Sequence, residues 1–298
     1  MTVGCGNIEQ SNLFPEETLD ATGKSVFNSI YDQPDPRAYW RTLSTLDYRV
    51  PQEAKPYFLR CMKARRERMG APRSSAIVDL GCSYGVNSML LRFGLTIPDL
   101  YRRYATAEVS PLPRSALIAR DRQLKACRAF LDVRFTGVDI SRQAALYAAE
   151  AGLLDDFVVA DLEQRTLRPD DEAPLIAGAS LIISTGCVGY ITKISFARIL
   201  HHCRERPWMM HTVLRMFDFR HAEETLAQFG YVTARSQRLL KQRRFISHRE
   251  QERILDALSS AGINASGLEA DGWLYAHTYL AIPISDAEPG CMERILDP

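Results

Sequence analysis

Neither sign of charge dominates this chain. Its 298 residues include 37 Lys and Arg and 36 Asp and Glu, which gives a formal net charge of +1. Proteins that bind nucleic acid usually carry a clear basic excess that attracts the phosphate backbone. The balance of charge therefore disfavours a nucleic-acid partner.

Long apolar runs are missing as well. No stretch of about 18 apolar residues occurs, which is the length that a membrane-spanning helix needs. The first residues, Met-Thr-Val-Gly-Cys-Gly-Asn-Ile-Glu, lack the basic and apolar regions of a secretion signal. We therefore expect no membrane partner and a soluble, cytoplasmic protein.

The cysteines do not fall into the patterns of a disulfide framework or a zinc site. There are seven, an odd number, and they are scattered without a C-x-x-C pair. His201, His202 and Cys203 are adjacent, but consecutive residues on a helix point in different directions. We expect reduced thiols and no metal cofactor.

Apolar runs of strand and helix type alternate regularly from residue 75 onward. Such alternation predicts right-handed crossovers and a mainly parallel, doubly wound, Rossmann-like α/β sheet. The predicted strands are 77–80, 134–138, 157–160, 180–184, 208–213, 231–235 and 273–282. The predicted helices between them are 86–93, 142–151, 192–204, 221–229 and 247–261.

A chain of this length buries one large α/β core with a small addition. Residues 1–20 are polar and predict a flexible tail, and residues 21–74 predict an N-terminal helical cap, with a helix over 52–68. The core domain is expected over 75–298. Inserted helices are expected at about 94–131, before the second strand.

The turn from Gly81 to Gly85 joins the first predicted strand to a helix. Glycine permits positive φ and close approach of a ligand, and the free N–H groups of a helix start favour an anionic or hydrogen-bond-accepting group. The dinucleotide pattern G-x-G-x-x-G and the P-loop pattern G-x-x-x-x-G-K-S/T are both absent. Gly23-Lys24-Ser25 lacks the upstream glycine of a P-loop, and it indicates an ordinary helix start. The turn alone leaves the ligand open among several nucleotide-binding folds.

The sequence of this turn narrows the choice. Residues 79–85, Asp-Leu-Gly-Cys-Ser-Tyr-Gly, resemble the first motif of class I S-adenosylmethionine (SAM) dependent methyltransferases. The resemblance extends over about residues 75–282. It implies a seven-stranded sheet whose last strand is antiparallel, and SAM as the cosubstrate or sole substrate.

The resemblance also assigns site residues, because ligands of open α/β sheets lie at the carboxyl ends of the strands. It places the methionine part of SAM on the glycine turn, the ribose at the second strand end and the adenine at the third. The fourth strand end lies beneath the sulfonium. The implied SAM-binding residues are Asp79, Gly81, Cys82, Ser83, Gly85, Asp139, Ile140, Asp161, Leu162, Ser184 and Thr185.

Aromatic side chains are candidates for contact with the sulfonium cation, which their faces stabilise by roughly 0.5 to 2 kcal/mol when water is excluded. The candidates are Tyr84 in the turn, Tyr190 beyond the fourth strand, and Tyr31 or Tyr48 in the cap. Displacement at a carbon next to a sulfonium mostly requires alignment and dehydration, so a dedicated base is not required.

The acceptor is not identified by any motif. The Asp/Asn/Ser-Pro-Pro-Tyr/Phe loop of nucleic-acid amino methyltransferases is absent after the fourth strand, which favours a small-molecule substrate. A narrower resemblance, over 30–37, 46–51, 81–85 and 100–104, is to bacterial azetidine-2-carboxylate synthases. It implies that the α-amine of SAM closes a four-membered ring and expels methylthioadenosine. Methylation of a small acceptor on nitrogen or oxygen, and a non-catalytic SAM-binding module, remain alternatives.

Overall fold

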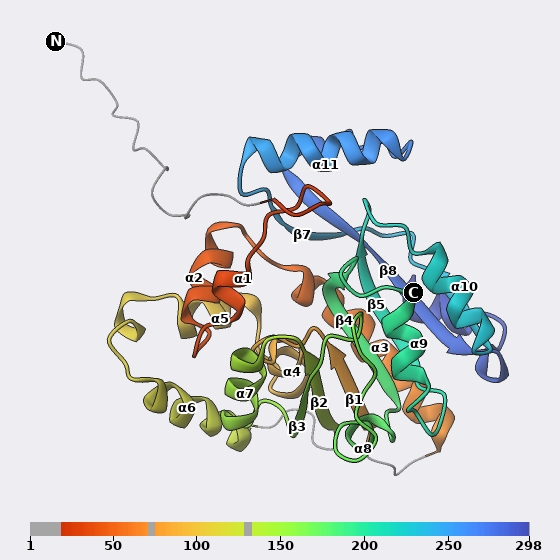
Figure 1. Cartoon of the computed structure of the whole chain (residues 1–298), viewed down its shortest axis with the longest axis horizontal. Helices are drawn as coiled ribbons and strands as arrows, with labels where there is room; N and C mark the ends of the chain where they lie inside the picture. The colour runs from red at the N-terminus through yellow and green to blue at the C-terminus, as the bar shows by residue number, and fades with distance from the viewer. Residues whose placement is uncertain (1–18, 71–74, 128–132, 298) are drawn as a thin grey trace.

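A mixed β-sheet forms the centre of the computed structural model, which describes residues 19–70, 75–127 and 133–297 (Figure 1). The described strands follow the order β3-β2-β1-β4-β5-β8-β6, with β7 also paired to β8. They are Ser75–Leu80 (β1), Val133–Asp139 (β2), Asp156–Val159 (β3), Leu181–Val188 (β4), Trp208–Leu214 (β5), Tyr231–Arg235 (β6), Leu240–Arg244 (β7) and Trp273–Pro283 (β8).

The pairing confirms the predicted doubly wound sheet with an antiparallel last strand. Strands β3, β2, β1, β4 and β5 are mutually parallel, and β8 runs antiparallel to β5. Since all the parallel strands point the same way, their carboxyl ends meet at one edge of the sheet, where ligands of such folds bind.

One strand was not predicted. No element is predicted over residues 240–244, yet β7 follows β6 along the same edge of β8, with Leu240 opposite Ala276 and Tyr231 opposite Pro283. The segment Leu-Lys-Gln-Arg-Arg has no apolar alternation, because its buried positions include the polar Gln242 and Arg243. The sheet therefore has eight strands in the described residues, one more than the seven expected.

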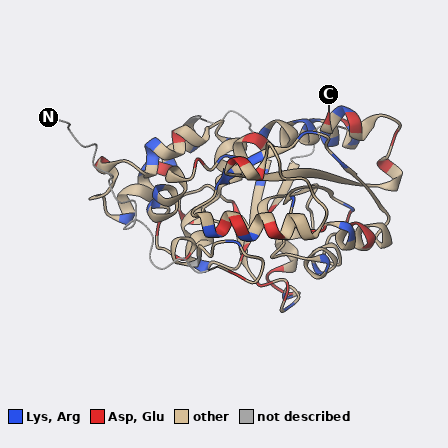
Figure 2. Ribbon diagram, turned by 90° about the horizontal axis from the view of Figure 1, so that it is seen from above, with Lys and Arg blue, Asp and Glu red and all other residues tan. Residues whose placement is uncertain are grey.

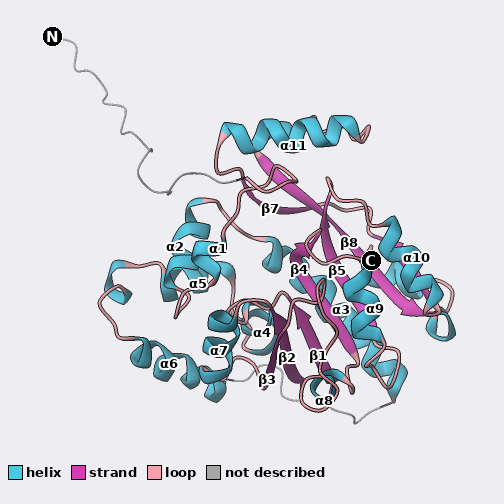
Figure 3. Ribbon diagram, viewed as in Figure 1, coloured by secondary structure: helices cyan, strands magenta, loops and turns pink. Residues whose placement is uncertain are grey.

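Both faces of the parallel strands are buried, which explains their nearly continuous apolar sequences. Neighbouring residues point to opposite faces. Ile77 packs in one hydrophobic cluster and Val78 in the other, and Ile183 and Ile182 divide in the same way. Two cores therefore sandwich one sheet, with helices outside each (Figure 3).

The larger core lies under most of the helices. They are Arg37–Thr45 (α2), Val50–Met69 (α3), Val86–Arg92 (α4), Ile97–Tyr104 (α5), Arg114–Arg122 (α6), Arg142–Glu150 (α7), His248–Ser260 (α11) and Cys291–Leu296 (α12). The smaller core lies under Ala173–Ile176 (α8), Lys193–Leu200 (α9) and Arg220–Gln228 (α10). Short 3₁₀ turns occupy Ala107–Val109, Gln123–Cys127, Glu269–Asp271 and Ile284–Asp286.

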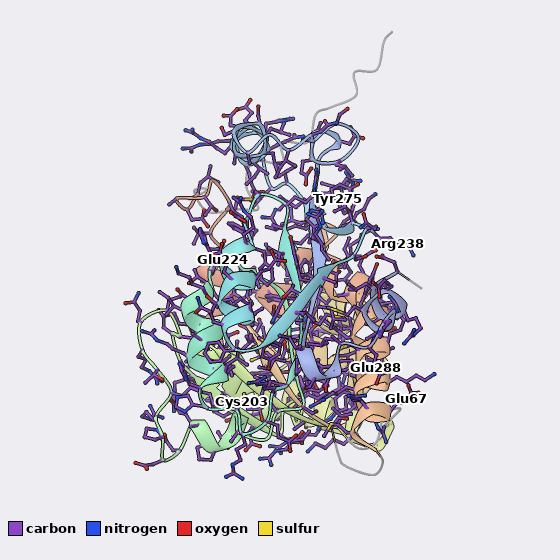
Figure 4. The ribbon with its side chains drawn as sticks, turned by 90° about the vertical axis from the view of Figure 1, so that its right-hand side faces the viewer. Glu67, Cys203, Glu224, Arg238, Tyr275 and Glu288 are labelled. Carbon is purple, nitrogen blue, oxygen red and sulfur yellow. The ribbon has the colours of Figure 1, made fainter. Side chains whose placement is uncertain are left out.

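The segment predicted as a cap contains Asn28–Tyr31 (α1), α2 and α3. Helix α3 packs directly on the sheet beside β4, β5 and β7, and the C-terminal α12 packs against it. Figure 4 shows Glu67, near the end of α3, and Glu288, just before α12, on the same side of the molecule. Residues 1–18 of the predicted tail and 71–74 of the predicted cap lie outside the described residues.

The predicted insertion contains α5 and α6, and its residues 128–131 lie outside the described part of the chain. The two helices are joined to the domain by the buried Asp121. Its carboxylate accepts hydrogen bonds from Tyr104 at 2.6 Å and from Tyr147 of α7 at 2.7 Å, and it pairs with Arg103 at 2.7 Å.

Lys and Arg residues are interspersed with Asp and Glu residues along the ribbon (Figure 2). Among the helices that the structure describes, none combines the length and the apolar character needed to cross a bilayer.

Candidate active site

A cavity of about 530 Å³ lies at the carboxyl ends of β1, β2, β3 and β4, and residues 20–31 form its opposite wall. It receives side chains or backbone from four predicted strand ends. The predicted residues that line it are Gly81, Cys82, Ser83, Asp139, Ile140, Asp161, Leu162, Thr185, Tyr31, Tyr48 and Tyr190. The topology thus brings together segments that are far apart in sequence.

The turn after β1 has the backbone that its glycines were expected to provide. Gly81 has φ of +67°, and a Cβ added there would lie 2.8 Å from Cβ of Cys187, so a side chain would collide with the last residues of β4. Ser83 also has positive φ, +47°. Its amide donates to Oδ2 of Asp139 at 2.7 Å. The turn is therefore fixed against the end of β2.

Asp139 is held by backbone amides on both of its oxygens. Besides the bond from Ser83, its Oδ1 accepts a hydrogen bond from the amide of Ser141 at 2.8 Å. Burial raises the pKa of Asp139 above its usual value, although these amides oppose the shift. A carboxylate oxygen accepts more than one hydrogen bond, so both oxygens can still receive ligand hydroxyl groups.

The end of β3 offers a second carboxylate to the same cavity. Oδ1 of Asp161 accepts the amide hydrogen of Glu163 at 2.9 Å, which orients the side chain. The neighbouring Leu162 is buried, while Ile140 at the end of β2 is 70% exposed. These residues combine a hydrogen-bond acceptor with apolar surfaces, a combination that suits a flat heteroaromatic ring.

Aromatic rings form much of the wall that faces the strand ends. Phe27, Tyr31, Tyr39 and Tyr48 line the cavity, and the rings of Tyr31 and Tyr39 meet at 5.3 Å in an edge-to-face arrangement. Burial raises the pKa of Tyr31 to about 12 and raises that of Tyr48 further. These hydroxyls are therefore neutral at physiological pH, so the aromatic part of the wall is uncharged.

Asp79 and Gly85 were predicted to bind SAM, but neither lines the cavity. Asp79 is fully buried, and its Oδ1 accepts a hydrogen bond from Nδ2 of Asn87 at 2.8 Å. Asn87 does line the cavity, so Asp79 reaches it only indirectly. Gly85 takes the left-handed conformation at the start of α4, where a Cβ would lie 3.1 Å from Cβ of Leu153. A glycine is therefore needed at this position for the packing of α4.

Ser184 and Tyr84 also lie outside the cavity lining. Ser184 is buried between strands, with its Oγ 2.7 Å from Nδ1 of His211. Tyr84 is fully buried, and its hydroxyl lies 2.9 Å from the carbonyl oxygen of Gln33. Its ring packs between Tyr39 and Tyr147. Tyr84 therefore anchors the segment after α1, and its burial leaves no face for a ligand.

Residues 19–27 are one part of the site that the sequence did not predict. Gly23-Lys24-Ser25 is a turn, not a helix start: Leu19 and Ser25 pair as an isolated bridge, and Gly23 has φ of +83°. Asp20, Lys24, Ser25 and Phe27 all line the cavity. We call residues 19–27 the strap. No local pattern marks it, because its contacts come from distant segments.

Two contacts hold the strap. Oδ2 of Asp20 accepts a hydrogen bond from the hydroxyl of Tyr190 at 2.8 Å. The amide of Ser25 donates to Oε1 of Glu250 at 2.8 Å. In Figure 1 this red segment runs from beside β7 and α11 to α1. The strap thereby connects the loop after β4 with α11.

Other lining residues also escaped prediction, including Tyr39, Asn87, Ser141, Glu163 and Cys187. Asn87 is the second residue of α4, the helix that follows the glycine turn, and this position next to the motif could have pointed to it. In the described ranges, no three His, Cys, Asp or Glu side chains gather closely enough to hold a metal ion.

No protein-family model and no curated protein matches this chain. Solved structures with a similar arrangement include magnesium protoporphyrin IX methyltransferase from Synechocystis, with 10% identity, a TM-score of 0.40, and 78% of this chain and 80% of that one covered. A TehB-like SAM-dependent methyltransferase from Corynebacterium glutamicum has 14% identity and a TM-score of 0.36, covering 73% and 85%. The cyclase SpnF has 13% identity and a TM-score of 0.37, covering 76% and 80%. At these scores the likenesses carry no inference about the activity of this chain.

Proposed function

We propose that this chain is an enzyme that binds SAM in the cavity at the ends of β1 to β4 and acts on a small molecule. The observation that carries the proposal is the pair of carboxylates at neighbouring strand ends, Asp139 and Asp161, both on one cavity beside the glycine turn. Asp139, fixed by two backbone amides, suits the two ribose hydroxyls. Asp161 suits the adenine amino group, and Ile140 and Leu162 suit the ring.

The aromatic side chains in the wall of the cavity favour a ligand that carries a positive charge. A sulfonium in contact with a tyrosine face gains about 2 kcal/mol when water is excluded. Tyr31 and Tyr48 line the side of the cavity opposite the strand ends, and Tyr190 lines it from the loop after β4, where the sulfur of SAM would face them. Because their hydroxyls stay protonated, these rings would stabilise the cation without pairing with it as anions.

The specific reaction that we propose is cyclisation of SAM to azetidine-2-carboxylic acid. The lone pair of the α-amine nitrogen attacks the γ-carbon, and the bond from that carbon to sulfur breaks. Its electrons pass to sulfur, which leaves as the thioether of methylthioadenosine, and the nitrogen loses one proton to solvent. Closing a four-membered ring demands alignment above all. A cavity of about 530 Å³, closed on one side by the strap, supports a single substrate folded on itself.

Methyl transfer to a nitrogen or oxygen of a small acceptor is the second candidate. The observation that favours it is the exposure of Tyr190, 46%, at the edge of the cavity. A second molecule could approach the sulfonium there. The acceptor would then be methylated, and SAM would leave as S-adenosylhomocysteine.

One incubation series separates these reactions. Purified protein is incubated with SAM alone and with SAM plus a panel of small amines and phenols, and the products are analysed by mass spectrometry. Cyclisation predicts azetidine-2-carboxylic acid and methylthioadenosine in equal amounts from SAM alone. The amino acid is the decisive product, because SAM also releases methylthioadenosine spontaneously, together with homoserine lactone.

The other outcomes are equally distinct. If S-adenosylhomocysteine forms, and forms only when an acceptor is present, the reaction is methyl transfer and not cyclisation. Binding of SAM in calorimetry without either product would indicate a non-catalytic SAM-binding module. Absence of SAM binding would overturn the whole proposal. Boiled protein gives the background in each arm.

A further inference from the structure

Lys24 is a buried amine on the wall of the cavity. Its residue is 6% exposed, and its Nζ lies 4.9 Å from the centre of the Tyr190 ring. Within the described ranges, no carboxylate lies within salt-bridge distance of this nitrogen. A buried ammonium without an ionic partner is costly, and a ligand anion would offset that cost.

The acidic side chains near Lys24 are already engaged. Glu250 accepts two hydrogen bonds from Arg243, at 2.6 and 2.8 Å, as well as the amide of Ser25. Asp20 accepts the hydroxyl of Tyr190 and the amides of Thr22 and Lys24. Both carboxylates attract the ammonium from a greater distance, while Arg243 repels it. Burial is the larger effect, and it lowers the pKa of Lys24 to about 8.

The position of Lys24 in the cavity indicates which ligand group it meets. Across the sheet the order is β3, β2, β1 and β4. Asp161 and Asp139 lie at the β3 and β2 ends, whereas Lys24 lies against Tyr190, beyond β4. A ligand whose adenine lies at β3 and whose ribose lies at β2 therefore extends toward Lys24. In SAM, the group farthest from adenine is the α-amino acid.

We infer that Lys24 is the counter-ion of the α-carboxylate of SAM. The inference rests on the proposed use of SAM. Lys24 lies on the strap, so the ion pair would join the substrate to the segment that covers it. The strap would then bind most firmly over a ligand that carries the carboxylate. The α-carbon would also be held while the amine remains free to turn toward the γ-carbon.

The test compares three ligands by calorimetry: SAM, decarboxylated SAM, which lacks only the carboxylate, and methylthioadenosine, which lacks the amino acid. Lys24→Met should weaken SAM binding roughly 10- to 100-fold, the range for a hydrogen bond to a charged group. Its affinity for the other two ligands should stay within about twofold of wild type. Lys24→Arg should recover much of the SAM affinity. Lys63→Met, on the exposed face of α3, is the matched control.

The pH dependence gives an independent readout. Because the ion pair needs a protonated lysine, SAM affinity of the wild-type protein should fall as pH rises above about 8. Lys24→Arg keeps its charge there, and it should lose less affinity over the same range. Any titration of SAM itself is shared by both proteins and cancels in this comparison.

The outcomes distinguish the two proposals. If wild type binds none of the three nucleosides, the use of SAM is overturned. If wild type binds SAM and Lys24→Met binds it equally well, the role of Lys24 is overturned while SAM use stands. If Lys24→Met keeps the wild-type melting temperature and yet loses affinity equally for all three ligands, Lys24 is a structural residue. That result would also overturn the ion pair.

Discussion

The hydroxyl of Tyr190 donates a hydrogen bond of 2.8 Å to Oδ2 of Asp20, across 170 residues of sequence. The bond joins the loop after β4 to the strap, at the edge of the cavity. Although burial opposes ionisation of Asp20, hydrogen bonds from Thr22 and Tyr190 hold the pKa of its carboxyl below the usual value. The acceptor is therefore charged at physiological pH, which strengthens the bond.

Breaking this bond should loosen the strap. We expect Tyr190→Phe and Asp20→Ala each to speed the release of SAM several-fold. The double variant should release it little faster than either single one, with a coupling of about 1 kcal/mol. Stopped-flow dissociation measures the rates. Tyr275→Phe, on β8 (Figure 4), is the control and should behave as wild type. Additive effects would show that the two side chains act separately.

The sheet could be predicted from sequence because its strands are buried on both faces. Val78 and Ile182 belong to short, nearly continuous apolar runs, which are typical of strands buried on both faces. Short polar turns end each run. Strand β7 could not be predicted in this way. Its buried positions include Gln242 and Arg243, and Arg243 is buried together with its ionic partner Glu250. An apolar pattern does not reveal a buried ion pair.

Some residues of the candidate site could likewise be predicted from sequence, and others could not. Asp139 and Asp161 were predicted because the ends of parallel strands converge, and the structure brings both to one cavity. The strap was missed because its contacts are long-range: Ser25 meets Glu250 across 225 residues. Tyr84 was assigned to the ligand because it lies in the glycine turn. Its side chain instead points into the core, a direction that the motif does not encode.

Asp139 should distinguish ligands by their ribose hydroxyls. Wild type should bind adenosine at least about tenfold more tightly than 2′,3′-dideoxyadenosine, since two hydrogen bonds to a carboxylate are lost in the analogue. Asp139→Asn should reduce that preference to a few-fold, with a similar loss of SAM affinity. Competition against SAM measures both. Asp156→Asn, at the start of β3, is the control. An unchanged preference in Asp139→Asn would remove Asp139 from the ribose site.

Asp79 should make the fold less stable as pH rises. Burial raises its pKa to about 7, although the hydrogen bond from Asn87 opposes this. Between pH 4 and 7 the unfolded chain ionises Asp79 while the folded chain keeps it protonated, so the free energy of unfolding falls across this window. Asp79→Asn removes that titration.

We therefore expect Asp79→Asn to match wild type near pH 4 and to exceed it by roughly 2 to 4 kcal/mol at pH 8. Chemical unfolding at both pH values measures the difference. Asp256→Asn, on the exposed side of α11, is the matched control. Destabilisation by Asp79→Asn that grows from pH 4 to pH 8 would show instead that the fold requires the charged carboxylate.

Glu250 should act in the opposite direction, since it stabilises the fold when charged. Burial opposes its ionisation, but Arg243 and two backbone amides prevail and lower its pKa to about 2. The stabilisation is therefore full at pH 7 and is lost as pH falls from about 4.5 toward 2.

Glu250→Gln leaves Arg243 buried without its partner, which should cost about 3 to 5 kcal/mol at pH 7. That difference from wild type should shrink at pH 3.5, in urea unfolding. Glu252→Gln, exposed on the same helix, should show no such change. A difference that stays constant with pH would mean that Glu250 contributes by packing, without its charge.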